Sequence, residues 1–459
     1  MENESKRTVA VIGAGLVGLM QVLVLLEHNF RVLIFESRKD PELQSKDESS
    51  RSINLTISRR GVDALKRHGL ENEAMNCVVP VKGRLIHKAN SLPEEMLYGN
   101  GEQFIYSIKR SKLHSILLQK VRTIIKDESQ GANKAKVEIF FSQKLKNIKK
   151  IYESGSKRFA LSFAMEEGEY DTIVDYVCGC DGINSVVRKN MTEVGCREDP
   201  IAHRYIELLL PANSDGGWPL DGEHLHIWPQ GEFMLLALPN TNKSFTLTLF
   251  MPESMLPEKN EAERFFNTYF PDVVALVTSG KPLHKQFLDN EPGKLRTVRC
   301  RKHYDSDGIV LLGDAAHAIL PFYGQGLNAG FEDCMLFSKE LDNHGNDFCK
   351  AAETYSQFRY KDTDAIADLS EENYIEMRSG VKNPLLKYKK QADSYLHCFF
   401  PKCYKPLYSM IVFDNVPYSK AQKIAKRQSN CLILTGLLVF IMIIIFVACT
   451  IAIAIITND

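Results

Sequence analysis

The stretch from Thr8 to Glu36 constrains the fold of this chain more than any other feature. A short apolar run rich in β-branched residues, Thr8 to Ile12, leads into Gly13-Ala-Gly-Leu-Val-Gly18, an apolar helical pattern and a second apolar run, Val32 to Phe35. This order predicts a strand, a glycine turn, a helix and a parallel strand, which is the unit that binds dinucleotides. The sequence therefore predicts an α/β fold built around a Rossmann-like parallel sheet.

Each glycine of this turn has a separate task. Gly13 permits the tight turn, Gly15 lets a pyrophosphate approach the backbone, and Gly18 lets the helix pack close to the strand. Glu36 follows Gly18 by 18 residues, where a carboxylate accepts hydrogen bonds from a ribose diol and repels a 2′-phosphate. The unit by itself leaves FAD and NAD open as ligands.

Later strands are predicted to end in turns of the same kind. The apolar run Thr172 to Val177 leads into Cys178-Gly-Cys-Asp-Gly182, and the run from Ile309 leads into Gly313-Asp314. The turn from Gly324 to Asn328 exposes backbone N–H groups at the start of a helix. Ligands bind beyond the carboxyl ends of the strands of an open parallel sheet, so these turns together predict one long dinucleotide ligand.

The middle of the chain predicts a second layer. Residues 203–300 contain many short apolar runs, so we expect a mixed or antiparallel sheet inserted between parts of the first domain. The clearest of these strands are Leu225–Trp228, Phe233–Leu238 and Ser244–Phe250. The other expected elements are strands at Val79–His87 and Phe104–Ile108, a strand at Phe159–Phe163 between basic turns, and a helix over Leu385–Tyr408.

Composition excludes several classes of function. The formal net charge is zero, which gives no reason to expect nucleic acid as a partner. The 11 cysteines show no spacing typical of a metal site, so we expect no metal and reduced thiols in a protein that faces the cytosol. The polar start, Met1 to Arg7, predicts no signal peptide.

The C-terminal stretch from Cys431 to Ile456 contains 26 residues without a charge. As a helix it would be roughly 39 Å long, against about 30 Å for the hydrocarbon core of a bilayer. Only three residues follow, so we expect a tail anchor that contacts membrane lipid. A group of basic residues precedes the span and predicts that the globular part faces the cytosol: Lys420, Lys423, Lys426 and Arg427.

The glycine and aspartate motifs together resemble a known family. Their order and spacing are similar to the three signatures of the FAD-dependent aromatic hydroxylases, which have the p-hydroxybenzoate hydroxylase fold. This resemblance covers roughly Val9 to Leu341 and rests on Gly13-x-Gly-x-x-Gly18 with Glu36, Cys180-Asp-Gly182 with Arg188, and Gly313-Asp-Ala-Ala-His317.

A closer resemblance, to the kynurenine 3-monooxygenase family, covers almost the whole chain. The hydrophobic C-terminal span belongs to it as well. The motifs that carry it are Arg51-Ser-Ile-Asn-Leu55, Arg84-Leu-Ile-His87, Leu225-His-Ile-Trp-Pro229, Ala237-Leu-Pro-Asn240, Asn242-Lys-Ser-Phe-Thr246, Thr248-Leu-Phe-Met-Pro252 and Asn373-Tyr-Ile-Glu-Met-Arg378.

The resemblance implies a chemistry. FAD is bound without a covalent link and reduced by NADPH, which docks transiently on the surface, and O₂ then forms a flavin C4a-hydroperoxide. Its electrophilic oxygen adds to the ring of L-kynurenine and gives 3-hydroxy-L-kynurenine, a step of tryptophan degradation. The cofactor performs this chemistry, which agrees with the lack of a Ser/His/Asp or metal constellation. The implied location is the mitochondrial outer membrane, with the endoplasmic reticulum as the alternative.

The resemblance also implies roles for individual residues. Arg84 is expected to bind the substrate carboxylate and Tyr98 to donate a hydroxyl to it. Asn373 and Tyr408 are expected to close the substrate pocket, and Phe322 and Phe245 to line it. His317 is expected to be structural rather than a base. The expected FAD contacts are Gly13, Gly15, Leu16, Val17, Gly18, Glu36, Arg38, Arg110, Asp181, Gly313, Asp314, Gly324, Gln325, Gly326, Leu327 and Asn328.

These assignments predict two domains that alternate along the chain. The FAD-binding domain is expected in three parts, the substrate domain in two, and the C-terminal region contains helices and the anchor. The predicted boundaries are 1–75, 109–200 and 301–345 for FAD binding, 76–108 and 201–300 for the substrate domain, 346–427 for the helical region and 428–459 for the tail anchor.

Three alternative functions remain open at this point. Another FAD-dependent aromatic hydroxylase or epoxidase of the same fold would share the FAD motifs and differ at Arg84 and Tyr98. A simple NAD(P)-dependent dehydrogenase is disfavoured by the late strand that ends in Gly313-Asp314. A catalytically silent, membrane-tethered flavin-binding protein is the third alternative, because a fold does not guarantee a function.

Overall fold

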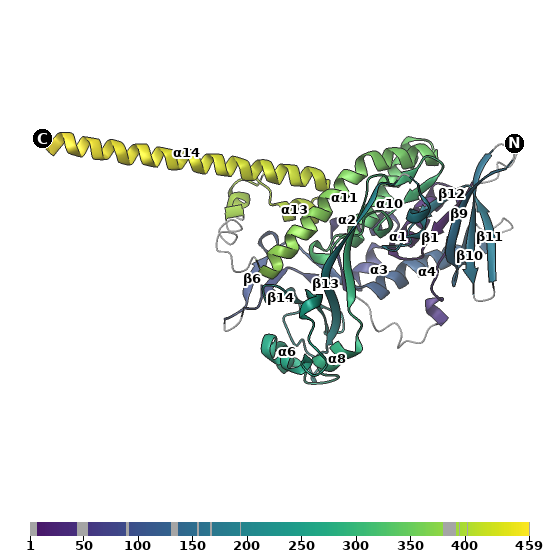
Figure 1. The fold of residues 1–459 in the computed structure, drawn as a ribbon, viewed down its shortest axis with the longest axis horizontal. Helices are drawn as coiled ribbons and strands as arrows, with labels where there is room; N and C mark the ends of the chain where they lie inside the picture. Colours follow the sequence, from purple (N-terminus) through teal and green to yellow (C-terminus); the bar gives the residue numbers. More distant parts are fainter. Residues whose placement is uncertain are drawn as a thin grey trace. The chain divides into compact units, whose positions relative to one another are not determined.

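The computed structural model describes residues 7–43, 54–88, 91–129, 136–153, 156–165, 168–192, 194–379, 392–393, 395–401 and 403–458. The chain divides into two compact units, residues 1–384 and 385–459, and each is described by itself. Among the described residues, all the strands and the helices α1 to α11 belong to the first unit (Figure 1).

A six-stranded sheet forms the centre of the first unit, in the order β18-β19-β12-β1-β2-β8. All neighbours in it pair in parallel except β18 and β19. Its inner strands are apolar and buried on both faces, as parallel strands covered by further layers usually are. The strands are β1 (Thr8–Ile12), β2 (Arg31–Phe35), β8 (Val137–Phe140), β12 (Tyr176–Gly179), β18 (Tyr304–Asp305) and β19 (Ile309–Leu311).

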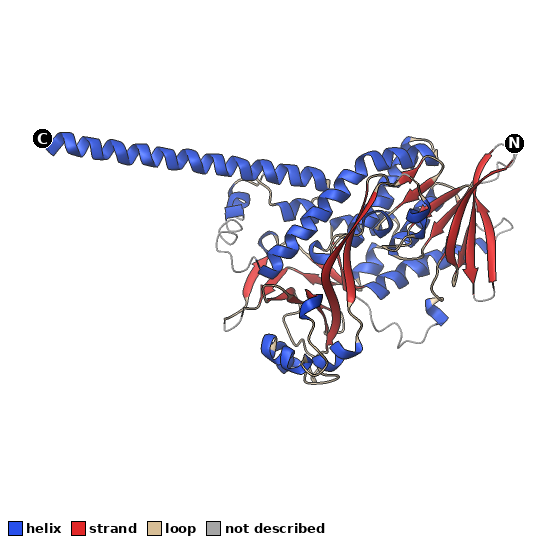
Figure 2. Cartoon of the chain, viewed as in Figure 1, coloured by secondary structure: helices blue, strands red, loops and turns tan. Residues whose placement is uncertain are grey.

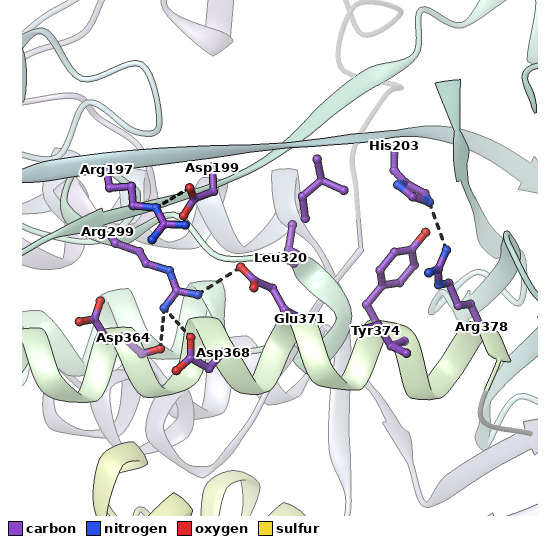
Figure 3. Close-up of a pocket in the computed structure, with 12 residues that line it drawn as sticks. Arg197, Asp199, His203, Arg299, Leu320, Asp364, Asp368, Glu371, Tyr374 and Arg378 are labelled. Atoms are coloured by element: carbon purple, nitrogen blue, oxygen red, sulfur yellow. Dashed lines mark hydrogen bonds and ion pairs between the residues drawn. The ribbon is translucent and has the colours of Figure 1, made fainter. Parts of the chain in front are cut away.

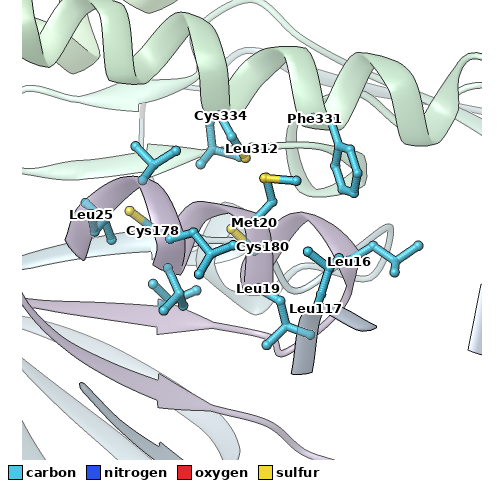
Figure 4. Packing of buried hydrophobic residues seen from close by; sticks show 14 of the residues in the cluster. Leu16, Leu19, Met20, Leu25, Leu117, Cys178, Cys180, Leu312, Phe331 and Cys334 are labelled. Carbon is cyan, nitrogen blue, oxygen red and sulfur yellow. The ribbon is translucent and has the colours of Figure 1, made fainter. Parts of the chain in front are cut away.

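Helices cover one face of this sheet. The apolar helix α1 (Leu16–Glu27) packs between α4 (Arg110–Ser129) and α10 (Gly326–Asn343). Figure 4 shows buried side chains of α1, among them Leu16 and Met20, below Phe331 and Cys334 of α10. This packing holds the start of α1, and with it the glycine turn, at the end of β1. The smaller helices of this layer are α2 (Arg59–Arg67) and α3 (Glu71–Met75). The helices α5 (Val186–Asn190) and α9 (Asp314–His317) contribute Val187, Ala315 and Ala316 to the buried cluster on the other face.

A three-stranded antiparallel sheet covers the other face (Figure 2). Phe159, Leu161 and Phe163 of its central strand share one buried cluster with Ala10 and Phe35 of the parallel sheet. The strands are β9 (Lys144–Glu153), β10 (Ser156–Met165) and β11 (Gly168–Val174).

Two expectations for this region are corrected. The apolar run Thr172 to Val177 is not one strand: β11 pairs with β10, and β12 pairs with β1. Asp175 separates them because its carboxylate accepts a hydrogen bond from the N–H of Thr8, at 2.7 Å, and binds Arg158. The basic stretch expected as a turn before Phe159 is strand β9. It is an edge strand with many exposed lysines, so its sequence lacks the apolar alternation that predicts a strand.

A seven-stranded mixed sheet forms the other large layer, in the order β17-β13-β16-β15-β14-β5-β6. All pairs are antiparallel except β14 with β5, which agrees with the mixed sheet expected for residues 203–300. The strands are β5 (Gly83–Ile86), β6 (Glu94–Leu97), β13 (Cys196–Leu210), β14 (His224–Pro229), β15 (Met234–Pro239), β16 (Phe245–Pro252) and β17 (Gly293–Cys300).

Short helices cover the outer face of the mixed sheet. Phe266 and Phe287 pack there against Leu208 and Leu247. The helices are α6 (Ala262–Tyr269), α7 (Pro271–Leu276) and α8 (Leu283–Asp289).

A small sheet, β3-β7-β4, joins the two large layers. The expected strand Val79–His87 is divided, because β4 pairs with β7 here whereas β5 belongs to the mixed sheet. The run breaks at Lys82, between β4 and β5, and Pro80 lies within β4, an edge strand of the small sheet, where a proline is tolerated. The strands are β3 (Asn54–Ile57), β4 (Val79–Val81) and β7 (Ile105–Lys109), and the 3-10 turns of the unit are η1 (Pro41–Leu43), η3 (Gly99–Gly101), η4 (Glu253–Met255) and η5 (Pro321–Tyr323).

One long helix, α11 (Phe348–Ser379), completes the first unit and packs against α10 and β17. The second unit contains α13 (Leu407–Val412) and α14 (Tyr418–Asn458). From Tyr418 to Thr450, α14 includes an 18-residue window with a mean hydropathy of 3.2 and none of its residues buried, so it is long and apolar enough to cross a membrane. The expected helix over Leu385–Tyr408 is not continuous: residues 392–393 and 395–399 are helical and α13 begins at Leu407, but 400, 401 and 403–406 are not helical, and 385–391, 394 and 402 lie outside the described residues. Pro401 and Pro406 stand at this break. The division into seven segments stays a prediction.

Candidate active site

Three neighbouring parallel strands, β19, β12 and β1, end in glycine-containing turns on one edge of the central sheet. Gly18 has no room for a side chain, since a Cβ there would lie 1.9 Å from the carbonyl oxygen of Gly13. Gly13 adopts a φ of 100°, and a Cβ there would lie 2.5 Å from the carbonyl oxygen of Cys180. Because these two positions have no side chain, the turn after β1 can pack directly against the start of α1 and against the turn after β12.

Gly15 and Gly182 differ from these packed glycines. A Cβ built at either position meets no atom within 4 Å. Their backbone therefore borders open space beside the start of α1 and the end of β12. A polar ligand can approach the main chain directly at these two positions.

Glu36 lies at the end of β2, next to the first turn. Its carboxylate accepts a hydrogen bond from the N–H of Ala14 at 2.9 Å and pairs with Arg38 Nε at 2.9 Å. Burial opposes ionisation, but the hydrogen bonds and the charge of Arg38 outweigh it, so the pKa of Glu36 lies below its ordinary value. An ionised carboxylate beside an exposed arginine suits a ribose diol.

Two aspartates follow the other strand ends. Asp181 accepts hydrogen bonds from the N–H groups of Val186 (2.6 Å) and Val187 (3.1 Å) with one oxygen, and so caps α5. Its other oxygen is buried without a hydrogen-bond partner among the described residues, and burial raises its pKa. Asp314 keeps an exposed side chain, yet the protein around it desolvates its carboxyl group and raises its pKa, while the positive charge of Arg110 opposes this shift.

A water-accessible carboxyl group that is surrounded by protein lies in an internal cleft rather than on the outer surface. Together with the bare backbone at Gly15 and Gly182, this cleft fits an elongated dinucleotide such as FAD. Leu16, Val17 and Arg110 begin the two helices that border it.

A buried ionic network supports the Gly313 turn from behind. Asp333 accepts hydrogen bonds from the N–H of Gly313 at 2.7 Å and from Arg359 Nε at 2.7 Å, and it lies 2.6 Å from His317 Nε2. Burial alone would raise the pKa of Asp333, but the charges of His317 and Arg359 hold it far below its ordinary value. His317 is thus engaged inside the protein, as expected for a structural residue.

Asn328 ties the last turn to the small sheet. Its amide donates to the carbonyl oxygens of Gly324 (2.8 Å) and Thr56 (2.9 Å), and its side-chain oxygen accepts from the N–H of Ser58 (2.8 Å). Asn328 is fully buried as a whole residue, so it holds this turn in place and exposes no group of its own to a ligand. Gln325 is buried as well, whereas Gly326 and Leu327 at the start of α10 are partly exposed.

Arg84 and Tyr98 are brought together, as expected for a shared ligand. Arg84 Nε lies 3.2 Å from the Tyr98 hydroxyl, and its guanidinium lies 5.8 Å from the centre of the Tyr98 ring. Tyr323 lies close enough to Arg84 to interact with its charge. Burial raises the pKa of the Tyr323 phenol, and the positive charge of Arg84 opposes this shift.

Phe322 and Asn373 also meet. Asn373 Nδ2 donates to the carbonyl oxygen of Phe322 at 2.6 Å, which fixes the η5 turn to α11. The Phe322 ring lies 4.8 Å from Phe250 and stacks on Tyr374 at 4.0 Å, measured between ring centroids. Tyr408 belongs to the second unit, so its predicted role beside Asn373 stays a prediction.

The placement of Phe245 corrects its expected role in lining this pocket. Side chains alternate along a strand, so Phe245 and Phe250 of β16 point to opposite faces of the mixed sheet. Phe245 packs at 5.5 Å from His226 on the outer face that α6 and α8 cover, away from Arg84. Phe250 lies on the opposite face of the sheet and contacts Phe322.

Sequence reasoning missed four residues of this region: Phe250, Tyr323, Asp333 and Arg359. Period-two alternation separates Phe245 from Phe250, but only the fold decides which of them faces the cleft. Tyr323 follows Phe322 directly in η5, and the glycines around this turn offered a signal for it. Asp333 and Arg359 lie on two long helices, α10 and α11, where a charged residue is usually solvated.

Comparisons with known proteins agree with this geometry. Residues 6–365 match the family model described as an FAD binding domain. The chain is 36% identical over 423 residues to kynurenine 3-monooxygenase of Sus scrofa, covering 91% of this chain and 86% of that protein. It is 35% identical over 439 residues to kynurenine 3-monooxygenase of Legionella pneumophila, covering 92% of each chain.

Among solved structures, p-nitrophenol 4-monooxygenase of Pseudomonas putida superimposes with a TM-score of 0.66 at 17% identity, covering 90% of this chain and 98% of that one. At this level of identity the likeness concerns the fold alone. It confirms the predicted α/β class with a parallel sheet interleaved with a mixed sheet.

Proposed function

The chain belongs to the kynurenine 3-monooxygenase family of FAD-binding proteins, and on this premise we propose that it hydroxylates L-kynurenine to 3-hydroxy-L-kynurenine with NADPH and O₂. The family is the one that the sequence motifs predicted, and FAD is its cofactor. Membership disfavours both a simple dehydrogenase and a phenol hydroxylase. The observation that carries the proposal is the contact between Arg84 and Tyr98.

Arg84 provides the group that distinguishes an amino-acid substrate from a simple phenol. Its guanidinium binds a carboxylate through charge-assisted hydrogen bonds, and the Tyr98 hydroxyl donates to the same group. Tyr98 is 6% exposed, so water competes little for this contact. With the carboxylate held at Arg84, the aromatic ring of the substrate lies toward Phe322 and Phe250.

The aromatic side chains around η5 exclude water from the substrate ring. Phe322 and Tyr323 are buried, and Asn373 holds the Phe322 carbonyl group in place. We propose that the turn from Gly324 to Leu327 presents backbone N–H groups to the edge of the flavin, next to these rings.

The remaining predicted contacts hold FAD along the strand ends. Gly13, Gly15 and Gly18 shape the pyrophosphate turn, Glu36 with Arg38 receives the ribose, and Arg110, Asp181 and Asp314 line the cleft further along. FAD, once reduced by NADPH, supplies the activation of O₂ that delivers one oxygen atom to the substrate ring. No protein base is needed for the attack, since the aromatic amine of the substrate itself donates electron density to the ring.

We propose that α14 anchors the protein in the mitochondrial outer membrane with the enzyme part facing the cytosol. The helix is compatible with an anchor by length and composition, and the basic residues before it favour this orientation. Removing residues 431–459 is expected to release the protein from the membrane fraction. A folded truncated protein that stays with membranes would refute the anchor, and full-length protein found with endoplasmic reticulum markers would refute the location.

Arg84→Met tests the substrate assignment. Loss of a charged hydrogen bond costs about 1.5–3 kcal/mol, so KM for L-kynurenine is expected to rise on the order of 10- to 100-fold while FAD content stays unchanged. Lys82→Met is the matched control, because Lys82 is a cation just before β5 that pairs with Glu223. An unchanged KM in Arg84→Met protein would remove Arg84 from the substrate site.

A further inference from the structure

A groove of about 630 Å³ lies along α11, on the side where β13 and β17 pass (Figure 3). It contains none of the residues predicted to contact FAD or the substrate carboxylate. One wall carries His203 from β13 and Arg299 from β17, and the other carries Glu371, Tyr374 and Arg378 from α11. Its volume falls within the range of small-molecule sites, roughly 300–1,000 Å³.

One end of the groove gathers hydrogen-bond donors. Figure 3 shows the Tyr374 hydroxyl directed between the His203 ring and Arg378. Tyr374 is 4% exposed, and its hydroxyl makes no hydrogen bond of ordinary geometry with the described residues. His203 Nδ1 and Arg378 Nε are also buried without such a partner there.

The donors at this end suit an anion, which would compete with the exposed carboxylate of Glu232 that pairs with Arg378 at 3.2 Å. Arg378 lies 5.1 Å from the Tyr374 ring centre and 3.5 Å from His203 Nε2. A guanidinium only donates, so the imidazole tautomer that accepts from it carries its proton on Nδ1, as a further donor. Burial raises the pKa of Tyr374 to about 12, which keeps its hydroxyl protonated, and burial with the charge of Arg378 lowers the pKa of His203.

The other end of the groove has an excess of carboxylates. Arg299 pairs with Asp368 at 2.7 Å and Glu371 at 3.1 Å, and the side chain of Asp364 lines the groove beside them. The charge of Arg301 also acts on Asp364, while Arg197 pairs with Asp199 at 2.6 Å. Burial raises the pKa of Asp364, against the charge of Arg299. An ammonium group would relieve this excess.

We propose that this groove is a second ligand site, which takes a free aromatic α-amino acid with its carboxylate at His203, Tyr374 and Arg378 and its ammonium group toward Glu371. Glu371 lies one turn before Tyr374 on α11, so a zwitterion can reach both ends. Leu320, Ile375 and the Tyr374 ring provide apolar surface for the side chain. The carboxylates repel polyanions such as nucleotides.

The site lies back to back with the substrate pocket. The ring of Tyr374 stacks on Phe322 with 15° between the planes, and Asn373, the preceding residue of α11, holds the Phe322 carbonyl group. The two sites therefore share one layer of side chains without sharing a ligand-binding group.

Isothermal titration of FAD-loaded, detergent-solubilised full-length protein with L-phenylalanine tests this site. Arg84→Met protein is the background, since it removes carboxylate binding at the proposed substrate site. We expect one binding event, weakened about tenfold or more by adding Arg378→Met and about three- to tenfold by adding Tyr374→Phe, which keeps the ring on Phe322. Tyr360→Phe makes the same change elsewhere on α11 and should leave the affinity unchanged.

Two analogues test the two ends of the ligand. 3-Phenylpropionate lacks the ammonium group and phenethylamine lacks the carboxylate, so each should bind at least tenfold more weakly than L-phenylalanine. Absence of binding in the Arg84→Met background, or equal binding after Arg378→Met and Tyr374→Phe, would overturn the proposal. If the Arg84→Met protein does not fold, wild-type protein compared with Tyr374→Phe protein decides in the same way.

Discussion

Asp333→Asn should be among the most damaging single substitutions in the flavin-binding part of this protein. The carboxylate of Asp333 is fully buried and contacts three groups: the Gly313 N–H, His317 and Arg359. Asparagine has nearly the same shape but turns an NH₂ donor toward one of these donors. Arg359 is also fully buried, and it would lose this partner while keeping Glu332, at 2.8 Å, and Asp362, at 4.0 Å.

Removing one partner of a buried ion pair costs about 3–5 kcal/mol because the other charge stays buried. That is a large part of the usual stability of a folded protein, roughly 5–15 kcal/mol. We therefore expect urea unfolding to show a loss of this size, and FAD affinity to fall because the Gly313 turn loses its support. Asp342→Asn, on the same helix but at an exposed side chain, should change stability by less than about 0.5 kcal/mol.

The sign of the pH dependence follows from the depressed pKa of Asp333. The stabilisation is complete above the ordinary carboxyl pKa, about 3.9, and is lost as the pH falls below it toward the folded-state pKa. The Asp333→Asn protein should lack this part of the acid dependence. A stability loss below about 1 kcal/mol together with unchanged FAD affinity would refute the assigned support role.

Three further predictions follow from single positions. Phe250→Ala should raise KM for L-kynurenine. Phe245→Ala should lower the unfolding free energy by about 3–5 kcal/mol and leave KM unchanged in the folded fraction. Equal effects of the two substitutions on KM would contradict the assignment of these residues to opposite faces of the sheet. Gly18→Ala should prevent folding or FAD loading, because the new Cβ meets the Gly13 carbonyl oxygen. Gly15→Ala should fold but lose FAD affinity. Normal FAD titration of both variants would exclude FAD binding at this glycine turn. Burial raises the pKa of Glu207 to about 7, against the charge of Arg110. The folded protein therefore keeps this proton at a pH where the unfolded chain releases it, and stability should fall as the pH rises from about 4.5 to 7. Glu207→Gln should flatten this slope in urea titrations, and an unchanged slope would contradict the prediction.

The sequence predicted the elements whose signals are local. The glycine turn after β1 follows from glycines that allow no Cβ, and the same kind of turn after β12 and β19 predicted one shared edge. The helices α1 and α10 begin where the sequence places a helix after a glycine turn. Arg84 and Tyr98 came from the family resemblance, and the structure brings them into contact.

Tertiary structure decided the rest. The run Thr172 to Val177 is continuous in hydrophobicity, and only the partners of Asp175 show that it serves two sheets. Phe245 and Phe250 have equally apolar surroundings in sequence, so the buried faces of the sheet had to be known to choose between them. Asp333 and Arg359 are 26 residues apart and gain their meaning from a contact between two helices.

The central claim is that this protein transfers one oxygen atom from O₂ to L-kynurenine. The most direct test is turnover of the FAD-loaded protein with NADPH and L-kynurenine under ¹⁸O₂, with the product identified by mass and retention. We predict NADPH oxidation that depends on L-kynurenine and 3-hydroxy-L-kynurenine that contains one ¹⁸O atom. A yellow, FAD-loaded protein that oxidises NADPH equally with and without L-kynurenine and forms no labelled product would contradict the claim.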